Sequence, residues 1–309
     1  MKLSTDFSAF AKYAWGTLIF NIAVILWGAY VRATGSGAGC GAHWPTCQGE
    51  VLPRAPQIET LVELSHRVTS GLAFLLVVAM LIWAYRAFPK KHPVRLGATL
   101  SMVLMVTEAL VGAGLVLFEL VAYNESVARV YAVSTHLVNT FLLLAALTLT
   151  AWWASGGKRI SLKPMRPAGW ATLVGMLAVL VLGVTGAITA LGDTLFPAGS
   201  LAEGIAQDFE PTAHFLIRLR VWHPVIAIFT GVYLLVLAQY LLGNAKNSVR
   251  TAARVLLGVF VAQLVIGGVN LVLLVPVWSQ MLHLLAADSV WVVLVILGAL
   301  IQQSPEEVT

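Results

Sequence analysis

One stretch of the chain decides its fold class. Residues 61–85 read LVELSHRVTSGLAFLLVVAMLIWAY, in which both charged side chains fall within the first seven positions. A helix of about 20 apolar residues crosses the hydrocarbon core of a bilayer. The stretch therefore predicts a membrane-spanning helix with a polar start.

Long apolar runs of this kind occur seven more times. The 309-residue chain is 59% hydrophobic and only 11% charged, whereas a soluble domain carries about 25% charged residues. The sequence excludes an ordinary soluble domain and predicts an all-α integral membrane protein with eight transmembrane helices. The run nearest the N-terminus, Tyr13–Val31, is longer than the apolar region of a signal peptide, which has about 7–15 residues, and we expect it to be retained. The other predicted spans are Tyr13–Val31, Leu96–Leu120, Val130–Trp153, Trp170–Leu191, Phe215–Leu242, Val255–Val275 and Met281–Ile301.

The net charge of +5 follows from topology and does not indicate nucleic-acid binding. Basic residues gather in alternate loops, and such loops face the cytoplasm. We therefore expect a multi-pass protein of the cell (plasma or inner) membrane with both termini cytoplasmic. The residues on the expected cytoplasmic side are Lys2, Lys12, Arg86, Lys90, Lys91, Arg95, Lys158, Arg159, Lys163, Arg166, Lys246, Arg250 and Arg254.

The chain also resembles itself after about 150 residues. Residues 108–112 read EALVG and residues 263–267 read QLVIG. Corresponding helices of the two copies are four spans apart. Because four is an even number, both copies enter the membrane in the same direction, as parallel repeats do. We predict two parallel-repeat four-helix bundles, residues 1–155 and residues 156–309. The other matching positions are Gly28 and Gly186, His66 and His223, and His136 and His283.

Four histidines fall at one depth in the expected spans. All four helices enter from the same side, which places the imidazoles within about 10 Å of one another along the membrane normal. A single such histidine is often an interhelical hydrogen-bonding group, but two facing imidazoles per bundle suit the axial positions of a low-spin haem. Zinc or copper would need further ligands beside each pair. The predicted pairs are His66 with His136 and His223 with His283.

The two halves differ three residues before the first histidine of each pair. Residues 63–67 read ELSHR, whereas residues 220–224 read RVWHP. A carboxylate beside a haem can take a proton or stabilise developing positive charge, and a guanidinium suits a haem propionate. Glu63 therefore predicts a reactive first half, and Arg220 predicts a second half that holds a permanent cofactor. The alternative for Glu63 is an ion pair with Arg67, four residues later.

Cys40 and Cys47 lie in the first external loop, where the compartment favours a disulfide. Free thiols, or a metal site that includes His43, are the alternatives. In the second half, Pro224 should disturb the helix around His223 because it has no backbone N–H to donate.

Two more ionisable residues fall within expected spans, Glu108 and Asp288. Each could carry protons, bind a substrate or serve as a hydrogen-bonded structural group, and the sequence leaves these alternatives open.

At these residues the chain resembles the bacterial haem A synthases over nearly its whole length. The resemblance rests on GAYVRATGSGAGC at residues 28–40, WPTC at residues 44–47 and ELSHR at residues 63–67. It implies two successive hydroxylations of the C8 methyl of haem O, which give the formyl group of haem A for cytochrome oxidases. Two departures are Glu108, where glutamine is expected, and the His-Pro pair at residues 223–224.

The resemblance also implies the site residues and partners. His66 and His136 would hold the substrate haem O with Glu63 at the reacting methyl, and His223 and His283 would hold a haem b. Arg67 and Arg220 are the predicted further contacts to the haems. Expected partners are haem O synthase, an unidentified electron acceptor and membrane lipid, and a homo-oligomer is left open. The alternative functions are a di-haem b electron carrier of the quinol oxidoreductase kind, which would place its haems at different depths, and a haem chaperone.

Overall fold

The computed structural model of the chain describes residues 8–161, 164–245 and 247–303. Within these ranges the regular structure consists of ten α-helices, one short 3-10 helix and no β-strand. Lys2, Lys163 and Lys246, which contribute to the predicted orientation, lie outside the described residues.

Eight helices in the described part of the chain are long and apolar enough to cross a membrane, as the sequence predicts. Each has 25 to 30 residues, which corresponds to about 38–45 Å of helix. They are α1 (Ala9–Ala33), α2 (Ile58–Ala87), α3 (Pro93–Leu117), α4 (Val127–Ala154), α5 (Pro167–Leu195), α7 with α8 (Phe215–Asn244), α9 (Asn247–Val272) and α10 (Val277–Ile301). The largest error is in α9, which begins eight residues before the predicted Val255 because Arg250 and Arg254 extend it beyond the apolar run.

The helices begin where local chemistry favours a start. Pro93 and Pro167 occupy the first positions of α3 and α5, where a proline lacks only an N–H that would have no partner in the helix. Ser8 and Ser126 precede α1 and α4, and their hydroxyls accept a backbone N–H of the first turn. Such caps stabilise a helix by about 1 kcal/mol.

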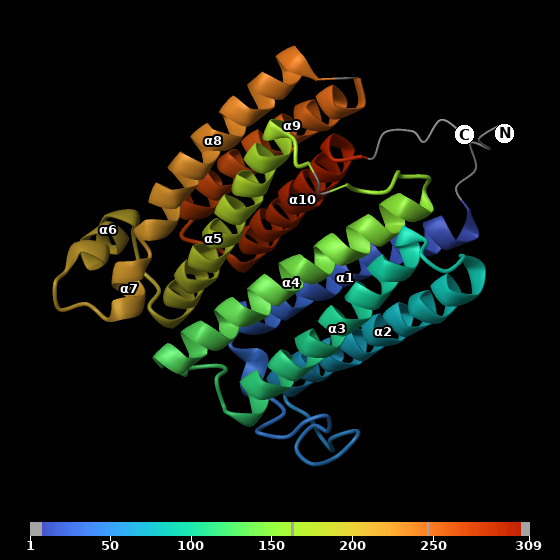
Figure 1. Cartoon of the computed structure of the whole chain (residues 1–309). Helices are drawn as coiled ribbons and strands as arrows, with labels where there is room; N and C mark the ends of the chain where they lie inside the picture. Colours follow the sequence, from blue (N-terminus) through green and yellow to red (C-terminus); the bar gives the residue numbers. More distant parts are fainter. Residues whose placement is uncertain (1–7, 162–163, 246, 304–309) are drawn as a thin grey trace, which may run out of the picture.

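The spans pack as two closed sets of four (Figure 1). In the first bundle, α1 to α4 pack in chain order and α4 returns to α1. In the second bundle, α5, α8, α9 and α10 do the same, and α10 returns to α5. This pattern is the one expected of a duplicated four-helix unit, although the duplication and the boundary near residue 155 stay predictions.

The two bundles meet through α1 and α4 on one side and α5 and α10 on the other. At the centre of this contact, the fully buried Trp291 donates from Nε1 to the carbonyl of Phe141 at 2.6 Å. Their rings also stack with centroids 5.1 Å apart. The contact buries an indole together with its one polar atom, so the bundles share a continuous core.

Large apolar side chains cover the outward faces of the spans. Phe229, Val236 and Val265 are 73%, 64% and 61% exposed, respectively. A soluble protein rarely leaves apolar surface of this extent in water. Together with the eight spans, this surface shows a multi-pass membrane protein.

The sixth span is interrupted beside His223, as the sequence predicts for Pro224. Helix α7 (Phe215–Leu219) ends and α8 (Trp222–Asn244) begins across Arg220 and Val221. Pro224 cannot donate to the carbonyl of Arg220, and the backbone N–H of His223 makes a 3.3 Å bond to that carbonyl instead. The interruption therefore lies directly before a candidate ligand.

The predicted spans do not include α6 (Leu201–Phe209), a nine-residue helix between α5 and α7. The Ser200 hydroxyl accepts from the backbone N–H of Glu203 at 3.2 Å. A serine followed three residues later by glutamate is a helix-start signature that could have revealed this element.

Candidate functional site

The four histidines lie at similar depths in helices that run in one direction. Each helix starts at the end of the molecule that carries residues 34–57, which we call the disulfide end. Counted from the first residue of the helix, the distances along the chain are eight residues from α2 to His66, nine from α4 to His136, eight from α7 to His223 and six from α10 to His283. At 1.5 Å per residue these depths are about 9–14 Å, so all four imidazoles occupy one layer.

A glycine from the preceding helix of the same bundle faces each imidazole. A Cβ placed on three of these glycines would approach a ring atom to less than 3.0 Å, which real Cβ atoms essentially never do. At these three positions the glycine thus allows two helices to approach closely around a histidine. The pairs and their distances are Gly28–His66 at 2.8 Å, Gly112–His136 at 3.9 Å, Gly186–His223 at 2.9 Å and Gly267–His283 at 2.9 Å.

In the second bundle, the two imidazoles are spaced as the axial ligands of a metal would be. The ring centroids of His223 and His283 lie 6.4 Å apart with an interplanar angle of 88°. A metal–imidazole bond of about 2 Å on each side, plus about 1 Å from nitrogen to ring centre, gives about 6 Å. The spacing and the glycine surroundings fit a bis-histidine haem.

No richer metal site competes with these pairs in the described ranges. Among the described residues, no three His, Cys, Asp or Glu side chains come together in a way that could hold a metal ion.

Three groups on α4 surround the carboxyl group of Glu108, which lies on α3. Its Oε1 lies 3.3 Å from His136 Nδ1 and accepts from the Thr140 hydroxyl. Its Oε2 accepts from Asn139 Nδ2 at 2.6 Å. The structure thus brings Glu108, one of the two unassigned ionisable residues, into contact with a candidate ligand.

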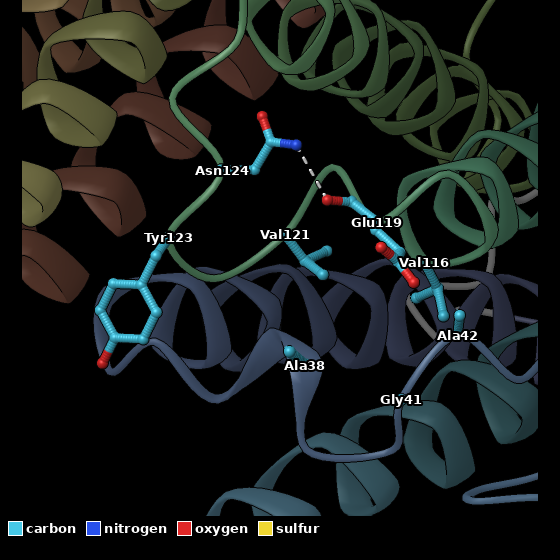
Figure 2. Close-up of a pocket in the computed structure, with 8 residues that line it drawn as sticks. All are labelled: Ala38, Gly41, Ala42, Val116, Glu119, Val121, Tyr123 and Asn124. Atoms are coloured by element: carbon cyan, nitrogen blue, oxygen red, sulfur yellow. Dashed lines mark hydrogen bonds between the residues drawn. The ribbon is translucent and has the colours of Figure 1, made fainter.

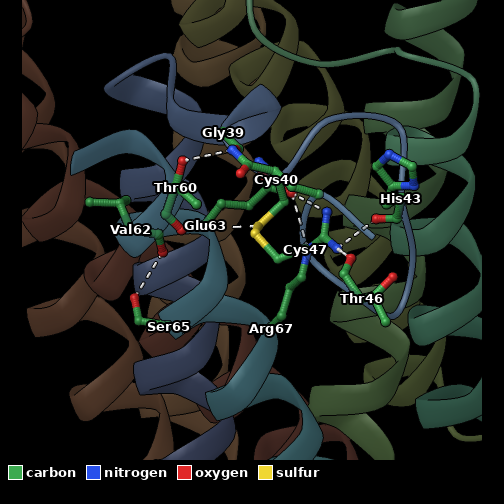
Figure 3. Close-up of a disulfide and its surroundings, with 11 residues drawn as sticks. Gly39, Cys40, His43, Thr46, Cys47, Thr60, Val62, Glu63, Ser65 and Arg67 are labelled. Carbon is green, nitrogen blue, oxygen red and sulfur yellow. Dashed lines mark hydrogen bonds and ion pairs between the residues drawn. A yellow bond between two sulfur atoms is a disulfide. The ribbon is translucent and has the colours of Figure 1, made fainter. Parts of the chain in front are cut away.

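Glu63 is buried beneath the first loop, with 3% of its surface exposed (Figure 3). Its Oε2 accepts from the backbone N–H of Cys40 at 2.8 Å. Its Oε1 accepts from Arg67 Nε at 3.1 Å and also pairs with Arg67 Nη2. The ion pair considered as the alternative for Glu63 is present, and the contact to the loop is an addition that the sequence did not suggest.

Cys40 and Cys47 form a disulfide, as predicted. Arg67 Nη1 donates to the carbonyls of His43 and Thr46, at 2.6 and 2.5 Å, which lie between the two cysteines (Figure 3). One arginine on α2 therefore holds both Glu63 and the disulfide loop.

Arg220 has a comparable task in the second bundle, although its charge is opposite to that of Glu63. Its Nε donates to Asp208 at 2.9 Å, its Nη1 to Asp193 at 3.0 Å and to the Phe196 carbonyl at 3.3 Å, and its Nη2 to Gln207 at 3.1 Å. Four of the five N–H groups of the guanidinium are thus engaged by the chain itself. The residue anchors α6 to the start of α8 and leaves one N–H for the predicted propionate.

Arg32, in the 28–40 motif, joins the two bundles at the disulfide end. It lies on α1, and its guanidinium donates to the Ala190 carbonyl at 2.7 Å and to the Thr194 hydroxyl at 2.9 Å, both on α5. It also donates to Gln280 on α10 at 2.8 Å. Arg32 has no predicted role, because nothing in a single sequence indicates contacts that span 158 to 248 residues.

A cavity of about 240 Å³ opens between the disulfide loop and the connection after α3 (Figure 2). Ala38, Gly41 and Ala42 line one side, and Glu119 and Tyr123 lie on the other. The volume is below the range of about 300–1,000 Å³ usual for ligand pockets, and none of the four histidines lines the cavity. It is therefore distinct from the candidate haem sites.

Asp288 lies on α10, five residues after His283, and is fully buried. Within the described part of the chain, neither of its carboxyl oxygens has a hydrogen-bond partner. Among the described residues, no hydrogen bond joins it to a candidate ligand, and its role stays open.

These features define a class: a multi-pass membrane protein of eight helices with two candidate bis-histidine sites in one layer. The particular family is shown by sequence comparison. The chain belongs to the COX15-CtaA family of cytochrome oxidase assembly proteins, whose model matches residues 11–295.

Two kinds of relative match this chain. A Thermus thermophilus protein named protoheme IX farnesyltransferase is 56% identical over 293 residues, which are 94% of this chain and 48% of that protein. The Heme A synthase of Alkalihalophilus pseudofirmus is 42% identical over 102 residues, which are 33% of this chain and 34% of that protein. The Heme A synthase of Exiguobacterium sibiricum is 38% identical over 118 residues, 38% of this chain and 37% of that protein. The chain thus spans about half the length of its Thermus relative.

Proposed function

We propose that the chain is a haem A synthase, an oxidoreductase that converts the C8 methyl of haem O to a formyl group by two successive hydroxylations. The observation that carries the proposal is the layer of four histidines, with the His223 and His283 rings 6.4 Å apart. Two sites in one layer suit electron exchange between neighbouring haems. They suit transport across the membrane poorly, because a carrier needs haems near both faces.

The relatives support this activity over the one in the Thermus name. The matching Heme A synthases align with about a third of this chain, and the family match covers residues 11–295. The Thermus protein is about twice as long as the matched part. We assign its farnesyl transfer to the part outside the match. Farnesyl transfer to protohaem IX yields haem O, so an enzyme of that activity is the proposed supplier of substrate.

The residue roles follow the two bundles. We propose that His66 and His136 hold haem O, and that His223 and His283 hold a haem b. A bound haem supplies the iron for electron exchange and, in the first bundle, carries the methyl group that is oxidised. Electrons leave through an acceptor that the chain's own residues do not identify.

Glu63 would act from the same helix face as His66, three residues away. Arg67 and Cys40 fix its carboxylate, so its negative charge is already oriented when the substrate binds. A preoriented charge stabilises positive charge that develops on the substrate better than a mobile one does. Arg67 directs four N–H groups to three acceptors, and Arg220 directs four to four acceptors. Each would therefore offer a propionate its one remaining N–H.

The orientation is proposed from charge alone. The connections opposite the disulfide end hold most of the loop lysines and arginines, so that end would face the cytoplasm with both termini. The disulfide end would then face the oxidising side of the plasma membrane, which is consistent with the bond between Cys40 and Cys47.

The test is to express the protein in a host that makes haem O and to identify the extracted haems by mass. The wild type should yield the alcohol and formyl products, and Glu63→Gln should retain its haems while oxidation stalls. Wild-type protein that binds haem O and never changes it would contradict the synthase and leave an electron carrier or a chaperone. A redox titration with quinol as sole donor would then separate these two.

A further inference from the structure

We infer that Glu108 is a positioning residue that lowers the reduction potential of the haem in the first bundle by engaging His136. The inference rests on the proposed function, because it requires His136 to be a haem ligand. It goes further by assigning a role to an internal carboxyl group that the proposed oxidation does not use.

The surroundings of Glu108 are built for a charged acceptor. Asn139 Nδ2 and the Thr140 hydroxyl donate to its two oxygens, and His136 Nδ1 lies 3.3 Å from Oε1. The ionised form of a carboxyl group only accepts, so it can use the Asn139 N–H and the Thr140 hydroxyl hydrogen, although that hydroxyl also lies 2.9 Å from the His136 carbonyl oxygen. The 3.3 Å approach to His136 Nδ1 is a charge contact and lacks the geometry of a hydrogen bond. Asn139 is itself oriented by the Thr107 hydroxyl, which donates to its Oδ1 at 2.6 Å.

The second bundle has an uncharged residue at the matching position, and this residue contacts the other ring nitrogen of its histidine. Gln263 takes the place of Glu108, and its Nε2 lies 3.4 Å from His283 Nε2. The residues three and four after His283 are Ala286 and Ala287, where the first bundle has Asn139 and Thr140. Gln263 Oε1 is buried and has no hydrogen-bond partner among the described residues. The charge and the donors that hold it are thus present in the first bundle alone.

This difference sets the relative potentials of the two sites. A carboxylate beside the non-ligating nitrogen of a ligand imidazole fixes the tautomer and makes the ligand more basic. A more basic axial ligand favours ferric over ferrous iron, and hydrogen bonding around the ligand is one of the means by which proteins tune haem potentials. The first haem should therefore be the weaker oxidant, and electrons should pass downhill from the first bundle to the second.

The experiment is an optical redox titration of the purified protein that contains both haems. His136→Ala and His283→Ala, each of which should lose one haem, assign the two midpoint potentials to the two bundles. In Glu108→Gln, the midpoint potential of the first bundle should rise, so the ratio of reduced to oxidised haem at a fixed potential should increase. Each tenfold increase in this ratio corresponds to about 59 mV for a one-electron couple. The second midpoint should not move.

A second variant separates charge from packing. Thr140→Val keeps the side-chain shape and removes one donor that competes with His136 for Glu108, so the first midpoint should shift the opposite way, to lower potential. If Glu108→Gln does not fold, the direction of the midpoint shift in Thr140→Val tests the inference by itself.

Two failures are distinguishable. Unchanged midpoints in a two-haem Glu108→Gln protein, or shifts of the same sign in both variants, would overturn the inference and leave the proposed function standing. If His136→Ala retains both haems, His136 is no ligand, and the inference falls together with the proposed haem sites.

Discussion

Replacing Gly28 by alanine tests whether the close contact between helices is what positions the candidate ligand. A Cβ at residue 28 would lie 2.8 Å from Cε1 and 3.0 Å from Nε2 of His66, whereas ordinary contact begins at 3.4 Å. The ring must therefore move by at least 0.6 Å (3.4 − 2.8). Catalytic and binding groups work only within about 0.5 Å of their productive positions.

The size of the effect follows from packing energetics. Overfilling a packed site costs about 1–3 kcal/mol, and each 1.4 kcal/mol is tenfold in affinity. Haem affinity in the first bundle should fall about 5- to 150-fold. The alanine itself favours a helix over glycine by about 1 kcal/mol, so the loss cannot come from helix propensity.

The assay is haem content per protein after purification, together with thermal unfolding in detergent. Gly112→Ala is the matched control in the same bundle, because its Cβ would lie 3.9 Å from His136, in ordinary contact. It should retain two haems and unfold no earlier than the wild type. The reasoning is refuted if Gly28→Ala keeps both haems with an unchanged spectrum, or if Gly112→Ala loses haem to the same extent.

Three further changes test the contacts at the disulfide end. Arg32→Met removes three hydrogen bonds between the bundles, each about 1.5–3 kcal/mol for a charged donor, and should lower the unfolding midpoint; an unchanged midpoint would show that the bundles do not depend on it. Arg220→Met leaves Asp193 without its cation and should lower the free energy of unfolding by an amount near the lower end of about 3–5 kcal/mol, because 18% of the aspartate side chain is exposed. Stability equal to wild type would contradict the anchoring role. Cys47→Ser removes a cross-link of about 2–3 kcal/mol, so residues 41–46 should be cut faster in limited proteolysis; equal cleavage rates would mean that Arg67 alone holds the loop.

The helical spans were predictable because apolar length is a local property. The eight helices required only runs of about 20 apolar residues, and the errors lie at polar ends such as Arg250 and Arg254 of α9. The short helix α6 was missed because it crosses no membrane, although Ser200 and Glu203 carried a usable signal. The disturbance at Pro224 could be predicted because a proline lacks the backbone N–H that would bond to one particular carbonyl, that of Arg220.

The site was predictable only as far as residue types and depth allow. The four histidines could be placed in one layer from the rise per residue, but the contact between Glu63 and Cys40 depends on how a loop folds back. The contacts that hold Arg220 were likewise not predictable, because Asp208 lies on α6, which is not among the predicted helices. Long-range packing decides such contacts, and no spacing within one sequence encodes it.

The opposite charges of Glu63 and Arg220 make the two bundles impossible to interchange one residue at a time. An arginine at position 63 would face Arg67 across a buried gap, and a glutamate at position 220 would face two aspartates. Either single exchange would set like charges against each other and release the loop above a histidine. To convert one half into the other, substitutions in a helix and in the loop that contacts it must therefore occur together. The character of each site thus depends on the loop segment that covers it.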